Sequence, residues 1–554
     1  MKKKLLAFFL TGVLMTGTFS AFAGCTIKED PLDPNKTTLY ISNYNGGQGT
    51  DWIDTENSTD DLIGRFEEAY KDVHFEEGKT GVQCRVAKTS TKGTTLISQM
   101  NGMTEEIFFS EDVPYSTASA AGYFLDVSDV IAEIQGYEGV SIDSERLSNI
   151  AVDGKYYAIP HYEIFDGINY DIDLFEKENL YFAENKDNGN KGFVLSAADV
   201  RSKGPDGQPR TWDDGLPASV DEFFALCDYM ITRGIIPMIW SGQYPFYFAS
   251  LMMAFSANYL SAEELMANFT FDSEGVETEV VTGFNAAGVP QIEKKVITPK
   301  NGNDVYAQAA KYYALDFMER IYSNSAYYYD KSTASSVFSN TDAQDVFVKS
   351  KLKGGKEKPI AMLVDGNWWY NEAKTAIKES YSYGAAAYNR KFGYMPIPTA
   401  QTTAQAEAGK EMKLLNRYNS YVFIRATIDP NKISAAKEFL KFCYLPENLQ
   451  QFTMDTGLHK AVEYTMTKEQ LAQLPYETKQ IMEYKMEHGS YDARSTSPIY
   501  IQNEGEILTA SVVNGYGYDY PTDAFKNKVS AKDYFKGMWV GSDTWNAMYS
   551  KFFD

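Results

Sequence analysis

Cysteine and histidine are scarce in this chain, and so are long apolar runs. The 554 residues include only four cysteines and four histidines. The cysteines beyond the N-terminal segment, Cys84, Cys227 and Cys443, are odd in number and widely spaced, which excludes a disulfide framework. Each lies in an apolar pattern, so we expect buried thiols. Beyond residue 24, no stretch approaches the ~18 uninterrupted apolar residues that a membrane-spanning helix needs.

Basic residues are outnumbered by acidic ones. The chain has 52 Lys and Arg against 75 Asp and Glu, which gives a formal net charge of −23. A field of this sign argues against nucleic acid, anionic membrane surfaces and acidic small molecules as partners. We therefore expect no nucleic-acid partner.

Motifs for catalysis and cofactor binding are absent from the sequence. His74, His161, His459 and His488 are scattered, and no H-E-x-x-H occurs. There is no G-x-S-x-G elbow, no P-loop and no G-x-G-x-x-G. We expect no catalytic residue, no metal and no cofactor. A glycoside hydrolase remains an alternative, because it needs only an aromatic cleft with two carboxylates about 5–10 Å apart.

The N-terminus has the parts of an export signal: a basic start, an apolar run and small residues before Cys25. These residues resemble the lipobox of bacterial lipoproteins, in which the cysteine becomes the acylated N-terminus, although Phe22 stands where an aliphatic residue is usual. The sequence therefore predicts a signal peptide over residues 1–24, lipidation at Cys25 and a polar, lipid-anchored tether over 25–36. An ordinary secretory signal with a chance cysteine is the alternative.

Aromatic residues are abundant, with 40 Tyr and 33 Phe, and 44% of the chain is apolar. That is enough for large cores, and the length suggests two or more domains. Most of these rings are expected in the core, but amphipathic rings also line binding clefts.

Strand and helix patterns alternate before residue 160. Strands are expected at Thr38–Ser42, Val82–Val86 and Glu106–Ser110, with an amphipathic helix over 62–70 after the first. This order predicts an α/β fold with a mainly parallel sheet. The Gly-rich loop Asn43–Asp51 follows the first strand, where ligands sit in open α/β sheets.

The stretch Val152–Tyr181 carries a turn, a short strand ended by Pro160, and a second strand. We interpret it as the place where the chain leaves one lobe for another. Further on, 204–215 is rich in Gly, Pro and Asp; turns are the first interpretation and a calcium site the second, although the EF-hand pattern is absent. Residues Val276–Pro299 predict a β-hairpin.

Several weak motifs, in their order and spacing, make most of the chain resemble the extracellular solute-binding proteins of ABC importers, in the group that binds sugars and oligosaccharides. Departures are Asp171, where the family often has Asn, and extra residues at 186–215 and 271–300. The motifs are Phe66–Tyr70, Asp153–Pro160, Tyr170–Phe175, Pro217–Phe224, Ala361–Met362 with Gly366–Trp368, Met395–Pro398 and Ala436–Phe442.

This resemblance implies a two-lobe, type II periplasmic-binding-protein-like fold that closes on its ligand about a hinge. One lobe would comprise 37–160 plus 417–458 and the other 161–416 plus 459–554. The protein would be a monomer outside the cytoplasm, held at the cell membrane through its lipid alone, and would pass a carbohydrate to a permease. Alternatives are a SusD-like surface glycan-binding lipoprotein and a binder of another solute, such as a peptide or an organic cation.

Sugar rings offer apolar C–H faces and a rim of hydroxyls, which flat rings and carboxylate or amide acceptors can bind. We expect one of the adjacent indoles of Trp368 and Trp369 to face the cleft and the other to be core. Arg494 is better explained as a partner for a carboxylate. The candidate ligand-binding residues are the aromatic Trp368, Trp369, Tyr244, Phe246, Tyr247 and Trp240 and the polar Glu163, Asn45, Asp51 and Asp365.

Overall fold

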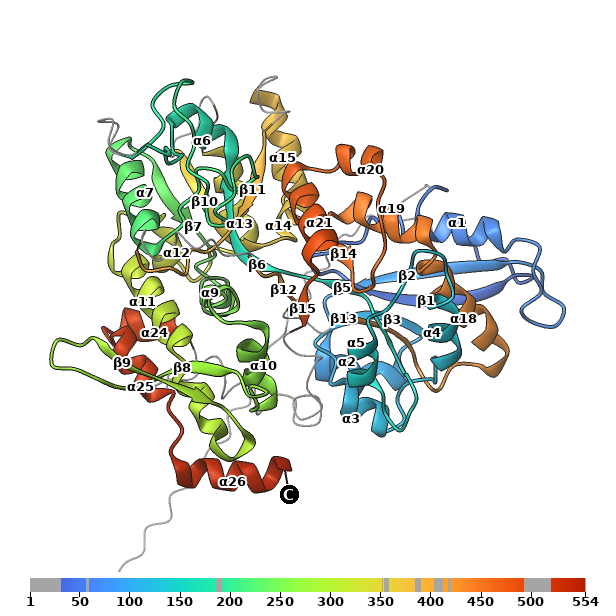
Figure 1. The fold of residues 1–554 in the computed structure, drawn as a ribbon. Helices are drawn as coiled ribbons and strands as arrows, with labels where there is room; N and C mark the ends of the chain where they lie inside the picture. The colour runs from blue at the N-terminus through green and yellow to red at the C-terminus, as the bar shows by residue number, and fades with distance from the viewer. Residues whose placement is uncertain are drawn as a thin grey trace, which may run out of the picture.

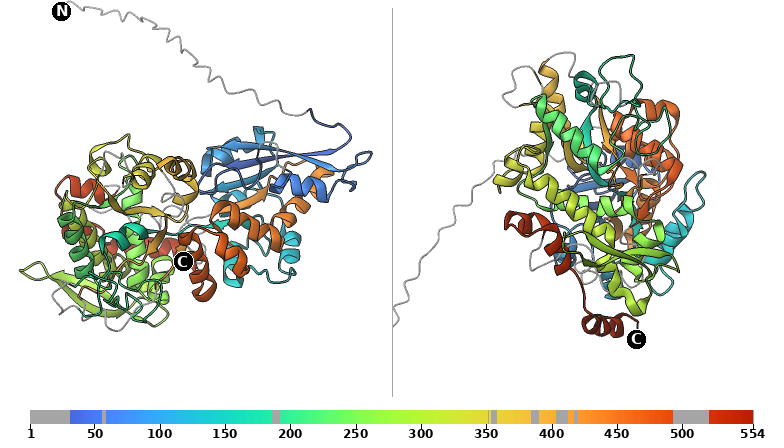
Figure 2. Two further views of the ribbon diagram at one scale, coloured as in Figure 1. Left: turned by 90° about the horizontal axis from the view of Figure 1, so that it is seen from above. Right: turned by 60° about the vertical axis from the view of Figure 1, so that its left-hand side comes forward.

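The computed structural model has two lobes, each built on its own β-sheet (Figure 1 and the left view of Figure 2). The predicted signal peptide, Cys25 and Arg494 lie outside the described residues. Those residues are 31–55, 59–185, 192–350, 352, 358–383, 390–402, 412–416, 420–492 and 520–553.

The first lobe contains a five-stranded sheet in the order β2-β1-β3-β13-β4. β1 (Thr37–Tyr44) is parallel to both β2 (Val82–Thr89) and β3 (Ile107–Glu111), which confirms the predicted parallel strands. β13 (Ser420–Ile424) returns from far along the chain and is antiparallel to β3 and to β4 (Ile159–Pro160). The helices of this part are α1 (Leu62–Ala69), α2 (Gly93–Gln99), α3 (Tyr115–Ala120), α4 (Ser128–Ile134), α5 (Ser144–Ile150), α18 (Ile433–Cys443), α19 (Pro446–Thr456) and α20 (Lys468–Gln473).

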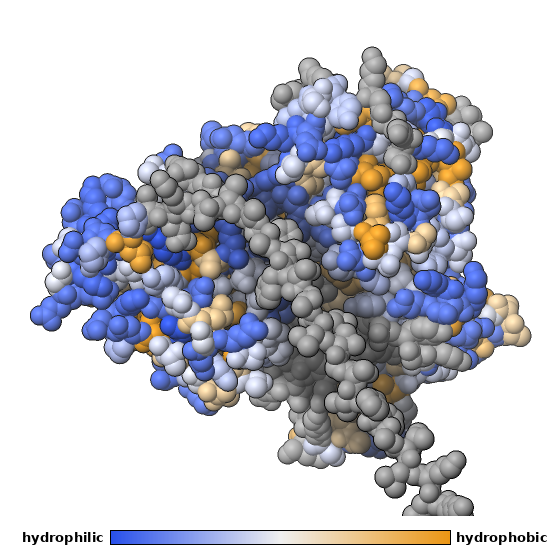
Figure 3. Space-filling view, turned by 180° about the vertical axis from the view of Figure 1, so that it is seen from behind, coloured by the Kyte–Doolittle hydropathy of each residue, from blue (hydrophilic) through white to orange (hydrophobic). Residues whose placement is uncertain are grey.

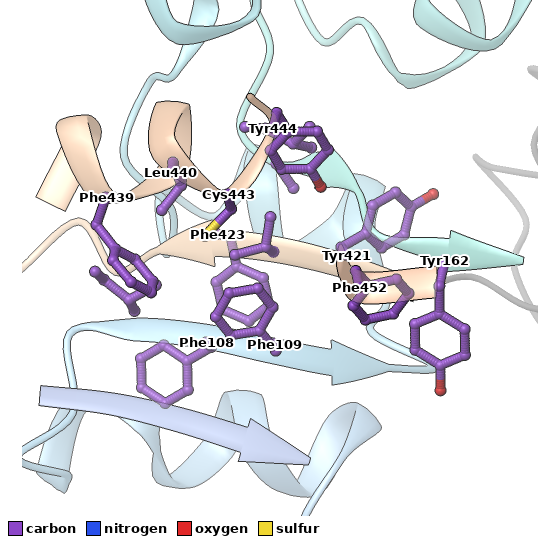
Figure 4. Close-up of a cluster of buried hydrophobic side chains, with 14 of the residues drawn as sticks. Phe108, Phe109, Tyr162, Tyr421, Phe423, Phe439, Leu440, Cys443, Tyr444 and Phe452 are labelled. Carbon is purple, nitrogen blue, oxygen red and sulfur yellow. The ribbon is translucent and has the colours of Figure 1, made fainter. Parts of the chain in front are cut away.

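Aromatic side chains fill the core of the first lobe between the sheet and helices α18 and α19 (Figure 4). Phe109 meets Phe439 of α18 edge to face, with ring centroids 6.3 Å apart, while on the opposite face of the sheet Phe108 and Phe423 stack across neighbouring strands with ring centroids 5.5 Å apart. The thiols of Cys84, Cys227 and Cys443 are free and buried, as predicted. Burial raises the pKa of all three thiols, which suits small core side chains rather than nucleophiles.

The second lobe contains a four-stranded sheet in the order β11-β6-β10-β7. β6 (Asp166–Asp171) is antiparallel to both neighbours, β11 (Phe392–Met395) and β10 (Ile360–Gly366), while β7 (Ile236–Ile239) is parallel to β10. The predicted hairpin is present as β8 (Glu277–Phe284) and β9 (Pro290–Val296). The helices are α6 (Ile172–Glu178), α7 (Val220–Thr232), α8 (Phe246–Ala249), α9 (Leu251–Tyr259), α10 (Ala262–Thr270), α11 (Ala309–Ser323), α12 (Lys331–Ala334), α13 (Asn340–Lys349), α14 (Trp369–Glu372), α15 (Lys374–Ser380), α21 (Tyr476–His488), α24 (Pro521–Lys526), α25 (Ala531–Gly537) and α26 (Ser542–Phe553).

Two short ladders join the lobes. β5 (Tyr162–Glu163) is antiparallel to β14 (His459–Lys460), and β12 (Leu415–Asn416) is parallel to β15 (Tyr491–Asp492). The apolar side chains of 462–474 pack into the first-lobe core. We therefore propose that the chain returns to the second lobe at α21 rather than at residue 459.

Candidate functional site

Two adjoining cavities, of about 450 and 400 Å³, lie where the lobes meet. They share Asn45, Gly46 and Glu372, so together they form one groove with walls from both lobes. The first cavity is lined by Tyr44, Asn45, Gly46, Gly47, Lys92, Glu111, Tyr162, Ile164, Tyr244, Phe246, Tyr247, Asn340, Trp368 and Glu372. The second is lined by Asn45, Gly46, Gln48, Gly49, Thr50, Asp51, Trp52, Thr341, Asn371, Glu372, Lys374, Thr375 and Asp455.

Trp368 occupies the junction between the lobes, and glycines make room for it on two sides. A Cβ on Gly366, at the end of β10, would lie 1.8 Å from the indole. A Cβ on Gly47, in the opposite lobe, would lie 2.5 Å from the Cβ of Trp368. The Asn371 amide also donates a hydrogen bond to the Gly47 carbonyl at 2.7 Å. The loop after β1 thus touches the second lobe at the point where Trp368 enters the groove.

The aromatic candidates of 244–247 reach the same cavity. Tyr247 is buried and its ring centroid lies 6.2 Å from that of Trp368. Phe246 is half-buried and Tyr244 is 40% exposed. Together with Trp368 they place flat apolar surfaces along the second-lobe wall, the arrangement that ring stacking needs.

Polar groups of the first-lobe wall form a compact ion-pair cluster. Lys92 Nζ lies 2.9 Å from both Glu111 Oε2 and Asp112 Oδ2. Burial lowers the pKa of Lys92, but the two carboxylates outweigh burial and raise it above its ordinary value. The Tyr162 hydroxyl donates to Glu111 Oε1. Tyr44 lies beneath the ammonium, with its ring centroid 5.0 Å from Lys92 Nζ.

Glu372 supplies a carboxylate from the second-lobe wall. Its Oε2 accepts hydrogen bonds from Gln344 Nε2 at 2.7 Å and Asn340 Nδ2 at 2.8 Å. The same Gln344 nitrogen donates to Asp365 Oδ2 at 3.0 Å. Burial raises the pKa of Glu372, and burial together with Glu372 raises that of Asp365, because two carboxylates this close resist ionising together.

Four predicted ligand residues do not line the groove. Trp369 is fully buried, and its indole N–H donates to Glu477 Oε2 at 2.7 Å. Trp240 packs in the second-lobe core, and Asp365 is buried behind Glu372. Glu163 is buried at the hinge, as described below. Trp369 and Trp368 therefore separate into core and groove, because successive residues leave the end of β10 in different directions. We leave all four buried residues out of the proposed site.

Glu163 is held by cations rather than exposed to a ligand. Its Oε1 accepts from Arg146 Nη2 at 2.7 Å and Ser490 Oγ at 3.0 Å, and Lys485 Nζ lies 3.1 Å from its Oε2. Arg146 also binds the carboxylate of Asp492. Burial raises the pKa of Glu163, but Lys485 and Arg146 outweigh burial and lower it. This cluster, the hinge ion-pair cluster, ties α5, β5, α21 and β15 together.

Several groove residues are not among those predicted from the sequence, namely Tyr44, Lys92, Glu111, Asn340 and Glu372. Tyr44 and Glu111 end parallel strands β1 and β3, so the rule that singled out the loop after β1 also points to them. Asn340 and Glu372 lie on helices α13 and α14, and no spacing in the sequence connects them.

A third cavity, of about 790 Å³, lies between the 205–213 turns and α21. Asp213 is buried there, accepts hydrogen bonds from the Asp206 amide and the Thr211 hydroxyl, and has a pKa that burial raises to about 6. These bonds form turns, the first interpretation of this stretch. No group of three or more His, Cys, Asp or Glu in the described part of the chain is arranged to hold a metal ion.

The model of one family, described as bacterial extracellular solute-binding protein, matches residues 61–463. The chain belongs to this family. Its members' description places them outside the cytoplasm, and the described residues include no helix long and apolar enough to cross a membrane. Comparison with curated proteins finds no match.

Solved two-lobe solute-binding proteins share the fold. SBP RafE in complex with raffinose aligns with a TM-score of 0.53 at 15% identity, covering 93% of this chain and 100% of that one. A chitin oligosaccharide binding protein gives 0.53 at 14% identity, with coverage of 93% and 100%. Maltose-bound T. maritima MalE3 gives 0.51 at 12% identity, with coverage of 92% and 100%. The predicted two-lobe α/β fold is therefore confirmed, and a SusD-like protein built mostly of helical repeats does not fit the two sheets.

Proposed function

We propose that this solute-binding protein captures a neutral saccharide in the groove between its lobes and delivers it to the membrane subunits of an ABC importer. The observation that carries the proposal is the placement of Trp368. Its indole lies between the lobes, with the Tyr247 ring beside it and the carboxylates of Glu111 and Glu372 in the same cavity. Sugar C–H faces stack on such rings, and sugar hydroxyls donate to such oxygens.

The charges of the groove favour an uncharged ligand over an organic cation or a peptide. Glu111 is paired with Lys92, and burial raises the pKa of Glu372, which disfavours its charged form. A cationic ligand would meet the carboxylates of Asp51 and Asp455 only in the second cavity, away from the rings of the first. A peptide's carboxylate terminus would meet an acidic protein. Outside the groove, the surface seen from behind is mostly hydrophilic over both lobes (Figure 3). The structural neighbours named for raffinose, chitin oligosaccharide and maltose support the same class.

Capture would occur by hinge closure, the established mode of periplasmic binding proteins. A ligand that contacts both walls favours the closed state by the difference between its affinities for the two states. The Asn371–Gly47 hydrogen bond already joins the two walls directly and would add to the ligand's contacts in the closed state. The proposed site therefore comprises Trp368, Tyr244, Phe246, Tyr247, Asn45 and Asp51, together with Tyr44, Lys92, Glu111, Asn340 and Glu372.

The remaining expectations belong to the same proposal. The protein works as a monomer, tethered to the cell membrane through a lipid on Cys25, and does no chemistry on its ligand. It uses no cofactor, and its permease partner binds the closed conformation.

Isothermal titration calorimetry against raffinose, chitotriose and maltotriose tests the proposal, with chromatography of the saccharide afterwards. A cationic amine and a tripeptide of similar size serve as controls. We expect one-to-one binding of at least one saccharide, recovered intact, and no binding of the controls. Binding of a control alone would move the protein to another solute class, and cleaved saccharide would make it a hydrolase.

A further inference from the structure

Lys460 is a buried lysine that forms no ion pair with a carboxylate among the described residues. It is 1% exposed on the hinge strand β14. The rings of Phe452, Trp52, Tyr444 and Phe109 surround its Nζ, with centroids 4.3, 5.1, 5.1 and 5.8 Å away. No ion pair to it is formed by any carboxylate in the parts of the chain that the structure describes. Burying an unpaired ammonium is costly, so the rings and hydrogen bonds around Lys460 determine how well it is tolerated there.

The hydrogen bond that Lys460 makes starts a chain of buried polar groups. Lys460 Nζ lies 2.7 Å from His161 Nδ1, and His161 Nε2 lies 2.5 Å from Gln48 Oε1. Gln48 Nε2 then donates to Asn43 Oδ1 and to the Tyr44 carbonyl, both at 3.1 Å. Gln48 thus ties the loop after β1 to the end of that strand, and residues 44–52 line the groove.

The direction of each hydrogen bond in this series follows from the Tyr44 carbonyl at its far end. The Tyr44 carbonyl can only accept, so the amide nitrogen of Gln48 faces the loop and its oxygen faces His161. His161 must therefore carry its proton on Nε2, which leaves Nδ1 as an acceptor. Lys460 Nζ is the donor to this acceptor, and the bond is charge-assisted while the amine is protonated.

We propose that Lys460 is a positioning residue: its ammonium, acting through His161 and Gln48, orders the loop that forms the first-lobe wall of the groove. Loss of the proton from Lys460 weakens the first bond of the chain and loosens that loop. The hinge thereby senses pH on behalf of the ligand-binding wall. The proposal concerns the loop itself and does not depend on which solute the groove takes.

Lys460 is the group in this cluster whose charge changes near neutral pH. Burial lowers its pKa to about 7. The titratable groups that face it are His161, Cys443 and Tyr444 at the end of α18, and Tyr464, whose hydroxyl accepts from the Lys460 amide at 3.3 Å. Burial, with Lys460, lowers the pKa of His161, and burial raises that of Cys443 to about 12 and those of both tyrosines, so all four stay neutral.

Hydrogen–deuterium exchange of the peptide covering 43–53, in the full chain without ligand, tests the proposal. The variant is Lys460→Met, and Lys311→Met is the matched control. Lys311 is equally buried with a pKa lowered to about 7, but it lies in the second lobe and donates to a backbone carbonyl.

At pH 6 we expect exchange of this peptide to rise about tenfold in Lys460→Met, the effect of losing one charge-assisted hydrogen bond, and to be unchanged in Lys311→Met. At pH 9, where wild-type Lys460 is neutral and donates a weaker hydrogen bond, the difference between the variant and wild type should shrink. Equal exchange at pH 6, or the same rise in the control, would overturn the proposal.

A second measurement uses the wild-type protein, so it does not depend on the variant's folding. The chain has four histidines, and nitrogen-15 labelling makes the His161 imidazole observable. We expect the Nε2–H tautomer from pH 6 to 9, with an Nδ1 resonance that shifts as Lys460 titrates near pH 7. An Nδ1–H tautomer, or an Nδ1 resonance that does not move with pH, would refute the proposed series of hydrogen bonds from Lys460 to Gln48.

Discussion

The hinge ion-pair cluster predicts a large stability loss in Glu163→Gln. The substitution removes the carboxylate that lies 2.7 Å from Arg146 Nη2 and 3.1 Å from Lys485 Nζ, and all three side chains are buried. Breaking a buried ion pair on one side leaves an uncompensated charge, at a cost of ~3–5 kcal/mol. The amide oxygen of glutamine can still accept from one cation, so we expect a loss of about 3 kcal/mol in the free energy of unfolding, at the low end of that range.

Glu463→Gln is the matched control. Glu463 contacts the same Lys485 Nζ at 3.0 Å, but its side chain is half exposed. Exposed pairs contribute below about 1 kcal/mol, so the control should lose little. Urea unfolding at pH 7, followed by circular dichroism, measures both. If Glu163→Gln loses no more free energy than Glu463→Gln, the cluster is not what stabilises the hinge.

The pH dependence of the free energy of unfolding, compared between wild type and Glu163→Gln, gives an independent check. Burial raises the pKa of Glu163, but Lys485 and Arg146 lower it overall, so the folded state favours the ionised form. The stabilisation is then fully present above the ordinary carboxyl pKa of 4.5 and is lost as the pH falls through the lowered folded value. We expect the difference between wild type and Glu163→Gln to shrink on the acid side. A difference that grows there would contradict the assigned ion pairs.

Two further predictions concern the tryptophans and a buried lysine. Trp368→Ala should weaken saccharide binding by ~2–4 kcal/mol in calorimetry. Trp369→Ala should instead lower the free energy of unfolding by ~3–5 kcal/mol. If both variants weaken saccharide binding equally, Trp368 is not the binding residue. Lys311→Met should raise the thermal midpoint most below pH 7. Burial lowers the pKa of Lys311 from 10.5 to about 7 in the folded state. Between these two values the unfolded chain binds more protons, so wild-type stability rises with pH and is lowest below pH 7. Thermal scans at pH 6 and pH 10 measure this, and an equal gain at both would refute it.

Local pattern was enough to predict the features that depend on one strand or one turn. The loop after β1 was expected at the groove because the carboxyl end of a parallel strand faces a ligand site, and Asn45 and Asp51 line it. The separation of Trp368 from Trp369 follows from two neighbours leaving a strand end. Contacts between residues that are far apart in the sequence could not be predicted from local pattern. The family resemblance predicts a ligand contact at Glu163, but this side chain is buried against Arg146 and Lys485.

The two-residue ladder between β5 and β14 connects these observations. His459 pairs with Glu163 and Lys460 pairs with Tyr162 in the antiparallel register. Because successive strand residues point to opposite faces, one face of the ladder carries the hinge ion-pair cluster. The other face carries Lys460, which reaches the loop after β1, and Tyr162, whose hydroxyl reaches Glu111 in the groove.

A rotation of one lobe about this ladder must therefore disturb both faces. On one face it strains the buried ion pairs that link α5 and α21 through Glu163 of β5, which resist opening because an uncompensated buried charge is costly. On the other face it shifts groups that touch the groove wall directly. Substitutions on the two faces should consequently separate: Glu163→Gln changes the stability of the hinge, whereas Lys460→Met changes the order of the loop after β1. That separation makes the ladder, rather than either lobe alone, the element that couples the hinge to the groove.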